Sequence, residues 1–180
     1  MRCQKTTPAE KTHLSFQQSR KGEIELTVRQ ADIKDFERIQ SFSKQAAGLH
    51  IQNRPDIFKA SPEISKSEFK RLLKDKNIFI LVAEQNGEIV GYCKLRMLTC
   101  SVSNETLTAR AVGLIDEFFV DEKHRRQGIG TEFFGGVKAF AMSKGAQSIE
   151  LYVWSFNEPA RKLYESLGMK TQRTLMELKL

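Results

Sequence analysis

The stretch "VDEKHRRQGIGTEFF", Val120–Phe134, decides how this sequence is interpreted. Basic side chains precede two glycines, Gly128 and Gly130, in the spacing G-x-G. A β-rich run, Gly113–Val120, ends where the stretch begins, and apolar residues at helical spacing follow, namely Ile129, Phe133, Val137 and Phe140. The order strand, turn, helix exposes the free N–H groups of a helix N-terminus, which carry partial positive charge. The sequence therefore predicts an anion-binding turn at this place.

The residues of the turn suit phosphate. Glycines let the backbone approach phosphate oxygens closely, Arg125 and Arg126 add bidentate donors, and Thr131 adds a hydroxyl. Two familiar phosphate loops are excluded, because G-x-x-x-x-G-K-[ST] is absent and Phe133 stands at the third glycine position of a Rossmann fingerprint. On the residues alone, a basic connector that happens to carry glycines is the alternative.

The composition bounds the class of protein. The chain has 180 residues, which suits one domain of ~100–200 residues. A formal charge of +7 is compatible with nucleic acid, a membrane surface or a phosphorylated cofactor as partner. Residues 1–23 are polar and basic, so we expect a flexible basic N-terminal extension before a single domain over residues 24–180.

The sequence also argues against other classes. Apolar runs such as "IFILVA" are far shorter than the ~20 residues of a membrane span, and the N-terminus lacks the apolar segment of a signal peptide. Cys3, Cys93 and Cys100 form no metal-ligand spacing, so we expect no metal site. An odd number of cysteines suits reduced thiols, which predicts a cytoplasmic protein.

Hydrophobic periodicity predicts the element order β-α-α-β-β-β-α-β-α-β. The dipeptide Asn86-Gly87 predicts a type I′ hairpin turn, and the first helix is expected to fade near Gly48. The fold class is α/β (α+β), with a mixed sheet covered by helices. Strands are expected at residues 24–31, 78–85, 88–98, 113–120, 148–154 and 174–180, and helices after Asp32, from Ser65 or Ser67, from Gly128 and after Asn157.

Two motifs carry a resemblance to a known family. "VDEKHRRQGIGTEFF" resembles the acetyl-CoA motif [QR]-x-x-G-x-[GA] of the GNAT superfamily of N-acetyltransferases, with Arg125, Gly128 and Gly130 at its fixed positions. "LYVWSFNEPARKLYESLGMK" is similar to the second signature of the family, and the two stand in the family's order. "IDEFFV" before the first motif is somewhat similar to the diamine (polyamine) acetyltransferases. The match is specific over Gly113–Lys170.

The resemblance implies a fold and a binding site. It implies a mostly antiparallel central sheet of about six to seven strands flanked by about four helices. Acetyl-CoA would be the co-substrate, with the pantetheine arm along the end of a strand, the pyrophosphate on the glycine turn and no metal. The residues implied in binding are Phe118, Phe119, Val120, Arg125, Arg126, Gln127, Gly128, Ile129, Gly130, Thr131, Asn157, Ala160 and Tyr164.

Acetyl transfer to an amine needs a neutral amine and a protonated leaving thiolate, and an alkyl amine such as Lys has a pKa of ~10.4. Asp116 and Glu117 are the candidates to attract and deprotonate the amine, and Tyr164 is the candidate acid. Ideal strand alternation puts Asp116 and Glu117 on opposite faces, unless a β-bulge intervenes. The alternatives are cross-strand pairing of the acids with Lys94 and Arg96, and a core role for Tyr164.

The function expected is therefore N-acetylation of a small cationic amine by direct attack on acetyl-CoA in a ternary complex. The alternatives are a transferase for a protein N-terminus or lysine, and a non-catalytic acyl-CoA-binding module. We expect no nucleic acid and no membrane as partner, because the phenylalanines fall at buried-looking positions rather than between exposed cations. A homodimer is left open.

Overall fold

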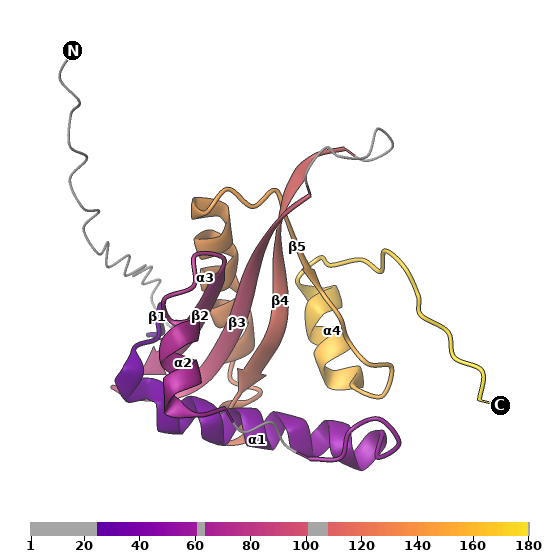
Figure 1. Cartoon of the computed structure of the whole chain (residues 1–180), viewed down its shortest axis with the longest axis horizontal. Helices are drawn as coiled ribbons and strands as arrows, with labels where there is room; N and C mark the ends of the chain where they lie inside the picture. Colours follow the sequence, from indigo (N-terminus) through magenta and orange to yellow (C-terminus); the bar gives the residue numbers. More distant parts are fainter. Residues whose placement is uncertain (1–24, 61–63, 101–107, 180) are drawn as a thin grey trace.

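The computed structural model describes residues 25–60, 64–100 and 108–179, and within these ranges five strands form one sheet in the order β1-β2-β3-β4-β5 (Figure 1). Neighbouring strands are antiparallel except β4 and β5, which run parallel. The α/β class with a mixed, mostly antiparallel sheet is thereby confirmed. The strands are β1 (Thr27–Gln30), β2 (Ile78–Gln85), β3 (Glu88–Cys100), β4 (Arg110–Val120) and β5 (Ser148–Leu151).

Turn chemistry fixes the register of the central hairpin. Asn86 and Gly87 join β2 to β3 with φ of 51° and 78°. Both values are positive, as a type I′ turn requires, and this turn matches the twist of the flanking strands. The hairpin predicted from Asn86-Gly87 is therefore confirmed.

Four α-helices cover the sheet, as predicted: α1 (Phe36–Asn53), α2 (Lys66–Leu72), α3 (Ile129–Ser143) and α4 (Glu158–Ser166). Side chains cap three of their starts. Asp32 accepts from the N–H of Lys34 before a short 3₁₀ turn that leads into α1, Ser65 accepts from Glu68, and Asn157 accepts from Ala160. α1 does not fade near Gly48 but continues to Asn53, because Gly48 lies on an open side where no packing depends on a side chain.

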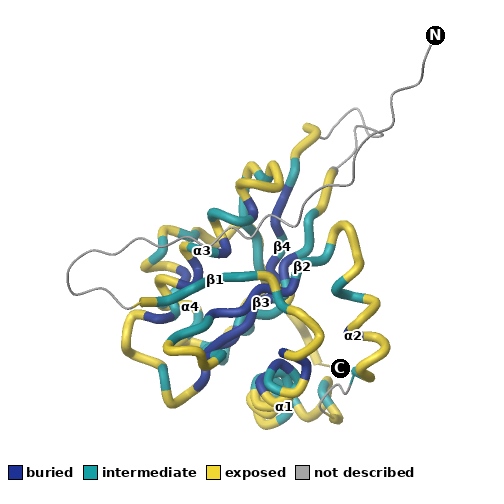
Figure 2. Tube along the Cα trace, turned by 90° about the vertical axis from the view of Figure 1, so that its left-hand side faces the viewer, coloured by how far each residue is buried: buried dark blue, intermediate teal, exposed yellow. Residues whose placement is uncertain are grey.

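Apolar residues pack in two cores, one on each face of the sheet. α3 and α4 cover one face, where Phe133, Val137 and Tyr164 pack on Leu81, Cys93 and Ile115. α1 and α2 cover the other face with Phe36, Ile39, Phe42 and Phe69, packed on Tyr92 and Phe119. Figure 2 looks almost along α1 and shows its buried side turned to the sheet. The central strands are thus buried from both sides.

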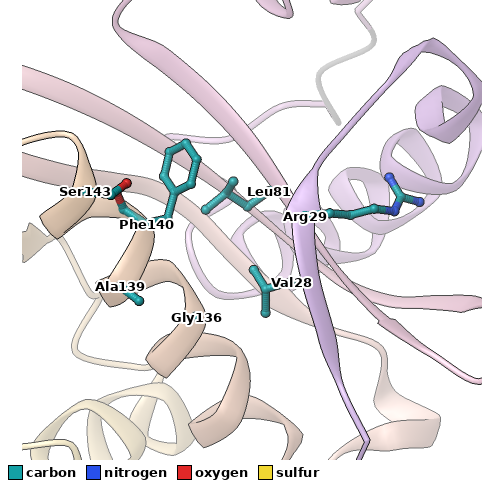
Figure 3. Close-up of a pocket in the computed structure, with 7 residues that line it drawn as sticks. All are labelled: Val28, Arg29, Leu81, Gly136, Ala139, Phe140 and Ser143. Atoms are coloured by element: carbon teal, nitrogen blue, oxygen red, sulfur yellow. The ribbon is translucent and has the colours of Figure 1, made fainter. Parts of the chain in front are cut away.

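α3 and β1 approach each other closely at Gly136. A Cβ on this glycine would lie 2.5 Å from Cγ2 of Val28, so only glycine fits without a shift of the strand. A small apolar crevice lies beside this contact, between β1 and the second half of α3 (Figure 3). It is far along α3 from the glycine turn, and its lining offers no group for acyl transfer. The residues around it are Val28, Arg29, Leu81, Gly136, Ala139, Phe140 and Ser143.

The expected C-terminal strand is wrong, and the sheet has five strands instead of six to seven. Residues 171–179 are extended and exposed, and no backbone hydrogen bond ties them to another described residue. The alternation of Met176 and Leu178 suits a strand, but these residues form no ladder with any described strand. β5 also ends at Leu151 rather than at Trp154. The expected flexible extension over residues 1–23 lies outside the described residues.

Candidate acyl-transfer site

β4 has an open edge next to the glycine turn. β3 pairs with β4 as far as Val120, but β5 pairs only with residues 112–115 of β4. Beyond that point β5 diverges from β4 (Figure 1). Among the described residues, the backbone of residues 116–120 therefore has no strand partner on its β5 side. Such an edge can accept an extended, amide-containing chain as an added strand.

A row of free N–H groups lies at the end of this edge. Arg126 and Gly128 have φ of 60° and 81°, so the backbone turns sharply between β4 and α3. Among the described residues, no hydrogen bond uses the backbone N–H groups of residues 126–130. They stand at the N-terminus of a 15-residue helix, where the helix dipole adds positive potential. This is the donor set that a pyrophosphate requires.

The side chains of the turn divide into structural and available groups. Nε of Arg125 donates to the carbonyl of Val120 at 2.9 Å, while its Nη1 contacts Glu122 at 3.1 Å. Its guanidinium also lies 5.3 Å from the ring centre of Phe119. Arg125 thus holds the turn on the end of β4. The side chains of Arg126 and Thr131 are exposed and have no partner among the described residues.

The side chains of other residues expected to bind the co-substrate make contacts within the protein instead. Gln127 donates to the carbonyl of Lys123 at 3.1 Å, and Ile129 is buried in the core. A Cβ on Gly130 would lie 3.3 Å from Cδ2 of Leu163, so the first turn of α3 abuts α4. Asn157 uses its side-chain oxygen to cap α4 on the N–H of Ala160 at 3.4 Å, which leaves its amide nitrogen free to donate.

Tyr164 lies beside the open edge of β4. Its ring packs on Phe118 of β4 and Phe134 of α3, with centroid distances of 6.3 Å to each. Its hydroxyl donates to no other described residue. Burial raises the pKa of Tyr164 well above its ordinary value of 10.0, and neighbouring Cys93 adds to the rise. The phenol therefore keeps its proton throughout the neutral range.

A β-bulge brings Asp116 and Glu117 to the same face of the sheet. Lys94 pairs with Glu117, and the next residue of β3, Leu95, pairs with Ile115, so Asp116 is the extra residue. The expectation of opposite faces is therefore wrong. Glu117 contacts Lys94 at 3.7 Å, and Asp116 accepts a bidentate pair of hydrogen bonds from Arg96. The cross-strand partners considered from the sequence are the ones observed.

Tyr92 is a site residue that sequence reasoning missed. Its hydroxyl donates a short hydrogen bond to Glu117, and its ring packs in the α1 core against Phe42 and Phe119. Burial, and then the carboxylate of Glu117, raise the pKa of Tyr92. Glu117 is anchored in this way, while its side chain is still 38% exposed. The sequence offered one signal, since Tyr92 stands two residues before Lys94 on the same strand face.

The acids and Tyr164 lie on opposite faces of the sheet. Glu117 belongs to the α1 face through Tyr92, whereas Tyr164 belongs to the α3 and α4 face. The open edge of β4 runs between them. A group seated along this edge would have the carboxylate on one side and the phenol on the other.

An aromatic cluster stands where the end of α1 meets the loop between β5 and α4. The ring of His50 lies 5.2 Å from Phe58 and 5.8 Å from Phe156, and Trp154 contacts both phenylalanines. Burial lowers the pKa of His50. The lowered pKa favours a neutral imidazole, so the cluster forms an apolar wall, with Arg54 stacked on Trp154 at its rim.

Within the described ranges, no group of three or more Cys, His, Asp or Glu side chains is placed to hold a metal ion. No helix among the described residues combines the length and apolar character that a bilayer crossing needs.

Comparisons with known proteins point to one family. The family described as "Acetyltransferase (GNAT) family" matches residues 45–169. An N-alpha-acetyltransferase of Sulfurisphaera tokodaii is 30% identical over 165 residues, covering 90% of each chain. The uncharacterized N-acetyltransferase YhfO of Bacillus subtilis is 28% identical over 145 residues, which are 79% of this chain and 89% of the relative.

Solved structures share the fold. A variant of the BH1408 protein from Bacillus halodurans superposes with a TM-score of 0.79 at 29% identity, covering 85% of this chain and 98% of that one. An aminoglycoside acetyltransferase from an uncultured soil metagenomic sample has a TM-score of 0.64 at 20% identity, covering 86% and 96% of the two chains. At that identity the likeness concerns the fold alone.

Proposed function

Because the chain belongs to the GNAT family of acetyltransferases, and is thus an acetyl-CoA-dependent N-acetyltransferase, we propose that it acetylates a primary amine by direct attack in a ternary complex. The observation that carries the proposal is the open edge of β4, with free N–H groups at one end and Tyr164 beside it. Residues 24–180 would form the single domain that does this.

The chain's own groups can hold each part of the co-substrate. The N–H groups of residues 126–130 bind the pyrophosphate, and Arg126 and Thr131 add side-chain donors. The backbone of Phe118, Phe119 and Val120 pairs with the pantetheine amides at the open edge. The carbonyl of Val120 is less available to the pantetheine amides than expected, since it already accepts a hydrogen bond from Arg125. The side-chain amide nitrogen of Asn157 is free to donate to the pantetheine arm.

Bond making and breaking then need two groups of this chain. The amine nitrogen attacks the thioester carbonyl carbon, the C–S bond breaks, and the nitrogen loses a proton. Glu117, or a water that it holds, takes that proton, because its carboxylate is anchored by Tyr92 and still exposed. Tyr164 donates its proton to the leaving sulfur, which its position on the opposite face allows. Asp116 keeps Arg96 in place and adds negative charge beside Glu117.

The acceptor we favour is a small cationic amine. The carboxylate of Glu117 is 38% exposed and lies 3.7 Å from Lys94, so it can also attract a cationic amine, and the apolar wall of His50, Phe58, Trp154 and Phe156 suits an alkyl or aromatic body. Lys94 and Arg96 offset the two acids, so the patch is not strongly negative. This charge balance disfavours a densely charged polycation relative to a monoamine.

A peptide N-terminus is the second candidate acceptor. The Sulfurisphaera tokodaii relative is an N-alpha-acetyltransferase, and it matches 90% of this chain. An α-amine has a pKa of about 7.7–8.0, so it would depend less on Glu117 than an alkyl amine does.

An amine panel with acetyl-CoA tests the proposal. Thiol release is followed with monoamines, polyamines, aminoglycosides, amino acids and short peptides. We expect turnover with at least one cationic amine, and Glu117→Gln should lower its kcat/KM roughly 10²-fold or more at neutral pH. The matched control is Glu37→Gln, at an exposed residue of α1 away from the turn, which should leave turnover unchanged. Turnover of peptides alone would transfer the proposal to the second acceptor, and no turnover of any amine would refute it.

A further inference from the structure

A buried carboxylate stands at the start of the glycine turn. Among the described residues only Asp35 and Asp121 are buried acids, and Asp121 directly follows the last residue of β4. Burying a carboxylate is costly unless charged or polar groups pair with it. The steps of acetyl transfer do not use Asp121, so its contacts within the protein must account for its burial.

Asp121 shapes the chain that leads into the turn. Its Oδ1 accepts from the N–H of Lys123 at 3.3 Å and so caps a short 3₁₀ turn, Glu122–His124. Its backbone N–H donates to the carbonyl of Val90 at 2.8 Å, which ties the end of β4 to β3. The orientation of Asp121 therefore sets where the chain leaves the sheet, just before the row of free N–H groups at residues 126–130.

Arg38 of α1 holds this carboxylate. α1 crosses the sheet near the end of β4 (Figure 1), and Nη2 of Arg38 donates to Oδ2 of Asp121 at 2.9 Å. The guanidinium is also fixed from two other sides. Its Nε donates to the carbonyl of Ile89 at 3.1 Å, and its central carbon lies 4.4 Å from the ring centre of Phe42. A planar group held in this way presents its donor to Asp121 in one geometry.

The neighbouring titratable groups do not replace this contact. Nδ1 of His124 is buried, has no hydrogen-bond partner among the described residues, and lies 3.9 Å from Oδ2 of Asp121, which is too far for a hydrogen bond. Glu88 contacts the same Nη2 of Arg38 at 2.8 Å, but its side chain is 59% exposed, so water competes for it. The contact between Arg38 and Asp121 is therefore the one by which α1 holds the turn.

We propose that Arg38 is a positioning residue for acetyl-CoA: through Asp121 it keeps the glycine turn in the shape that presents its N–H groups to the pyrophosphate. This inference rests on the proposed function, because it concerns the same co-substrate site. Hydrogen bonds weaken steeply outside a narrow range of distance and angle. A rotation of the chain at Asp121 would misalign several N–H groups together. With Arg38 in place the turn has its shape before the co-substrate arrives, and binding needs no reordering.

The test is the affinity of the full chain for CoA by isothermal titration, beside KM for acetyl-CoA and kcat with an amine that the wild type acetylates. In Arg38→Met the stem can still lie on Phe42 while the donors are lost. We expect Kd for CoA and KM for acetyl-CoA to rise roughly tenfold or more, with kcat at saturation within about twofold. Arg38→Lys keeps the charge but loses the planar fork, and should recover part of the affinity. The matched control is Glu88→Gln, which removes the charge of the exposed partner of the same Nη2 and should leave Kd unchanged.

Asp121→Asn separates the ion pair from the cap. The amide oxygen can still accept from the N–H of Lys123, whereas the charge that Arg38 binds is gone. This variant should weaken CoA binding as Arg38→Met does, and the double variant should be no weaker than either, because both changes break the same contact.

Two outcomes would overturn the inference alone. One is an unchanged Kd for CoA in Arg38→Met, including the case in which only its free energy of unfolding in urea falls, since a merely structural role predicts that result. The other is a pair of losses that multiply in the double variant. A wild type that binds no CoA would overturn the proposed function as well, so the two failures are distinguishable.

Discussion

Replacing Tyr164 by phenylalanine tests the catalytic reasoning most sharply, because it removes a single oxygen. The ring contacts with Phe118 and Phe134 are kept, and the hydroxyl has no hydrogen-bond partner among the described residues. When the hydroxyl of a core tyrosine is hydrogen-bonded, replacing it by phenylalanine lowers the free energy of unfolding by about 0.5–1.5 kcal/mol. Tyr164 should lose less, so the free energy of unfolding should change by under about 1 kcal/mol.

The catalytic effect should be far larger. A positioned general acid contributes roughly 10²–10⁴-fold to a rate, which is about 3–5 kcal/mol of barrier. The phenol does not touch the N–H turn, so acetyl-CoA binding should be unaffected. We therefore expect kcat to fall by that factor while KM for acetyl-CoA changes less than about threefold.

The assay is thiol release at saturating acetyl-CoA and amine, with urea unfolding measured on the same protein. Tyr152→Phe is the matched control, since Tyr152 is 74% exposed and its hydroxyl accepts from Arg173. The raised pKa of Tyr164 adds a pH criterion: the acid stays protonated, so wild-type kcat should not decline from its ionisation below about pH 10. An unchanged kcat in Tyr164→Phe would refute the role, and a large loss of stability would show that the hydroxyl is structural.

Further predictions concern packing, pH and the turn. Gly135→Ala should stabilise α3 by about 0.5–1 kcal/mol, because a Cβ at this position meets no other atom. Gly136→Ala should lower the free energy of unfolding by about 1–3 kcal/mol, because its Cβ would collide with Val28. Equal unfolding midpoints of the two variants in urea would contradict the close approach of α3 and β1. Burial lowers the pKa of His50, so the unfolded chain binds a proton at this side chain more tightly than the folded chain does. Stability should therefore fall as the pH drops below about 6.5, and it should fall less in His50→Phe. The same dependence of Tm on pH in the wild type and in the variant would exclude this effect. Arg125→Met removes the hydrogen bond to the carbonyl of residue 120, and it should raise KM for acetyl-CoA with little change in kcat. Isothermal titration with CoA should show the same loss of affinity. An unchanged affinity would show that the turn keeps its shape without the Arg125 side chain.

Local patterns were sufficient for most of the fold. Asp32, Ser65 and Asn157 cap helices because their short polar side chains reach backbone N–H groups within the next turn. Asn86-Gly87 specifies its turn through positive φ alone. These features depend on neighbours in sequence, so a single sequence suffices to predict them.

The candidate site was predictable in part. The turn around Gly128 and its place between strand and helix follow from sequence, whereas the partners of its side chains do not. Arg125 looked like a phosphate donor, yet it bonds to the carbonyl of Val120, and Tyr92 was not recognised at all. Both depend on which side chains the sheet brings together.

The sequence by itself determined the element order as far as α4, the helix caps, the hairpin and the glycine turn, because each results from local backbone preferences and hydrophobic period. Only the tertiary structure decided that Asp116 and Glu117 share a face, since a single extra residue in the β3–β4 register rotates the strand and no local signal marks it. It also decided that the C-terminal run pairs with no strand among the described residues, because strand pairing is a long-range choice that a β-like pattern permits but does not make.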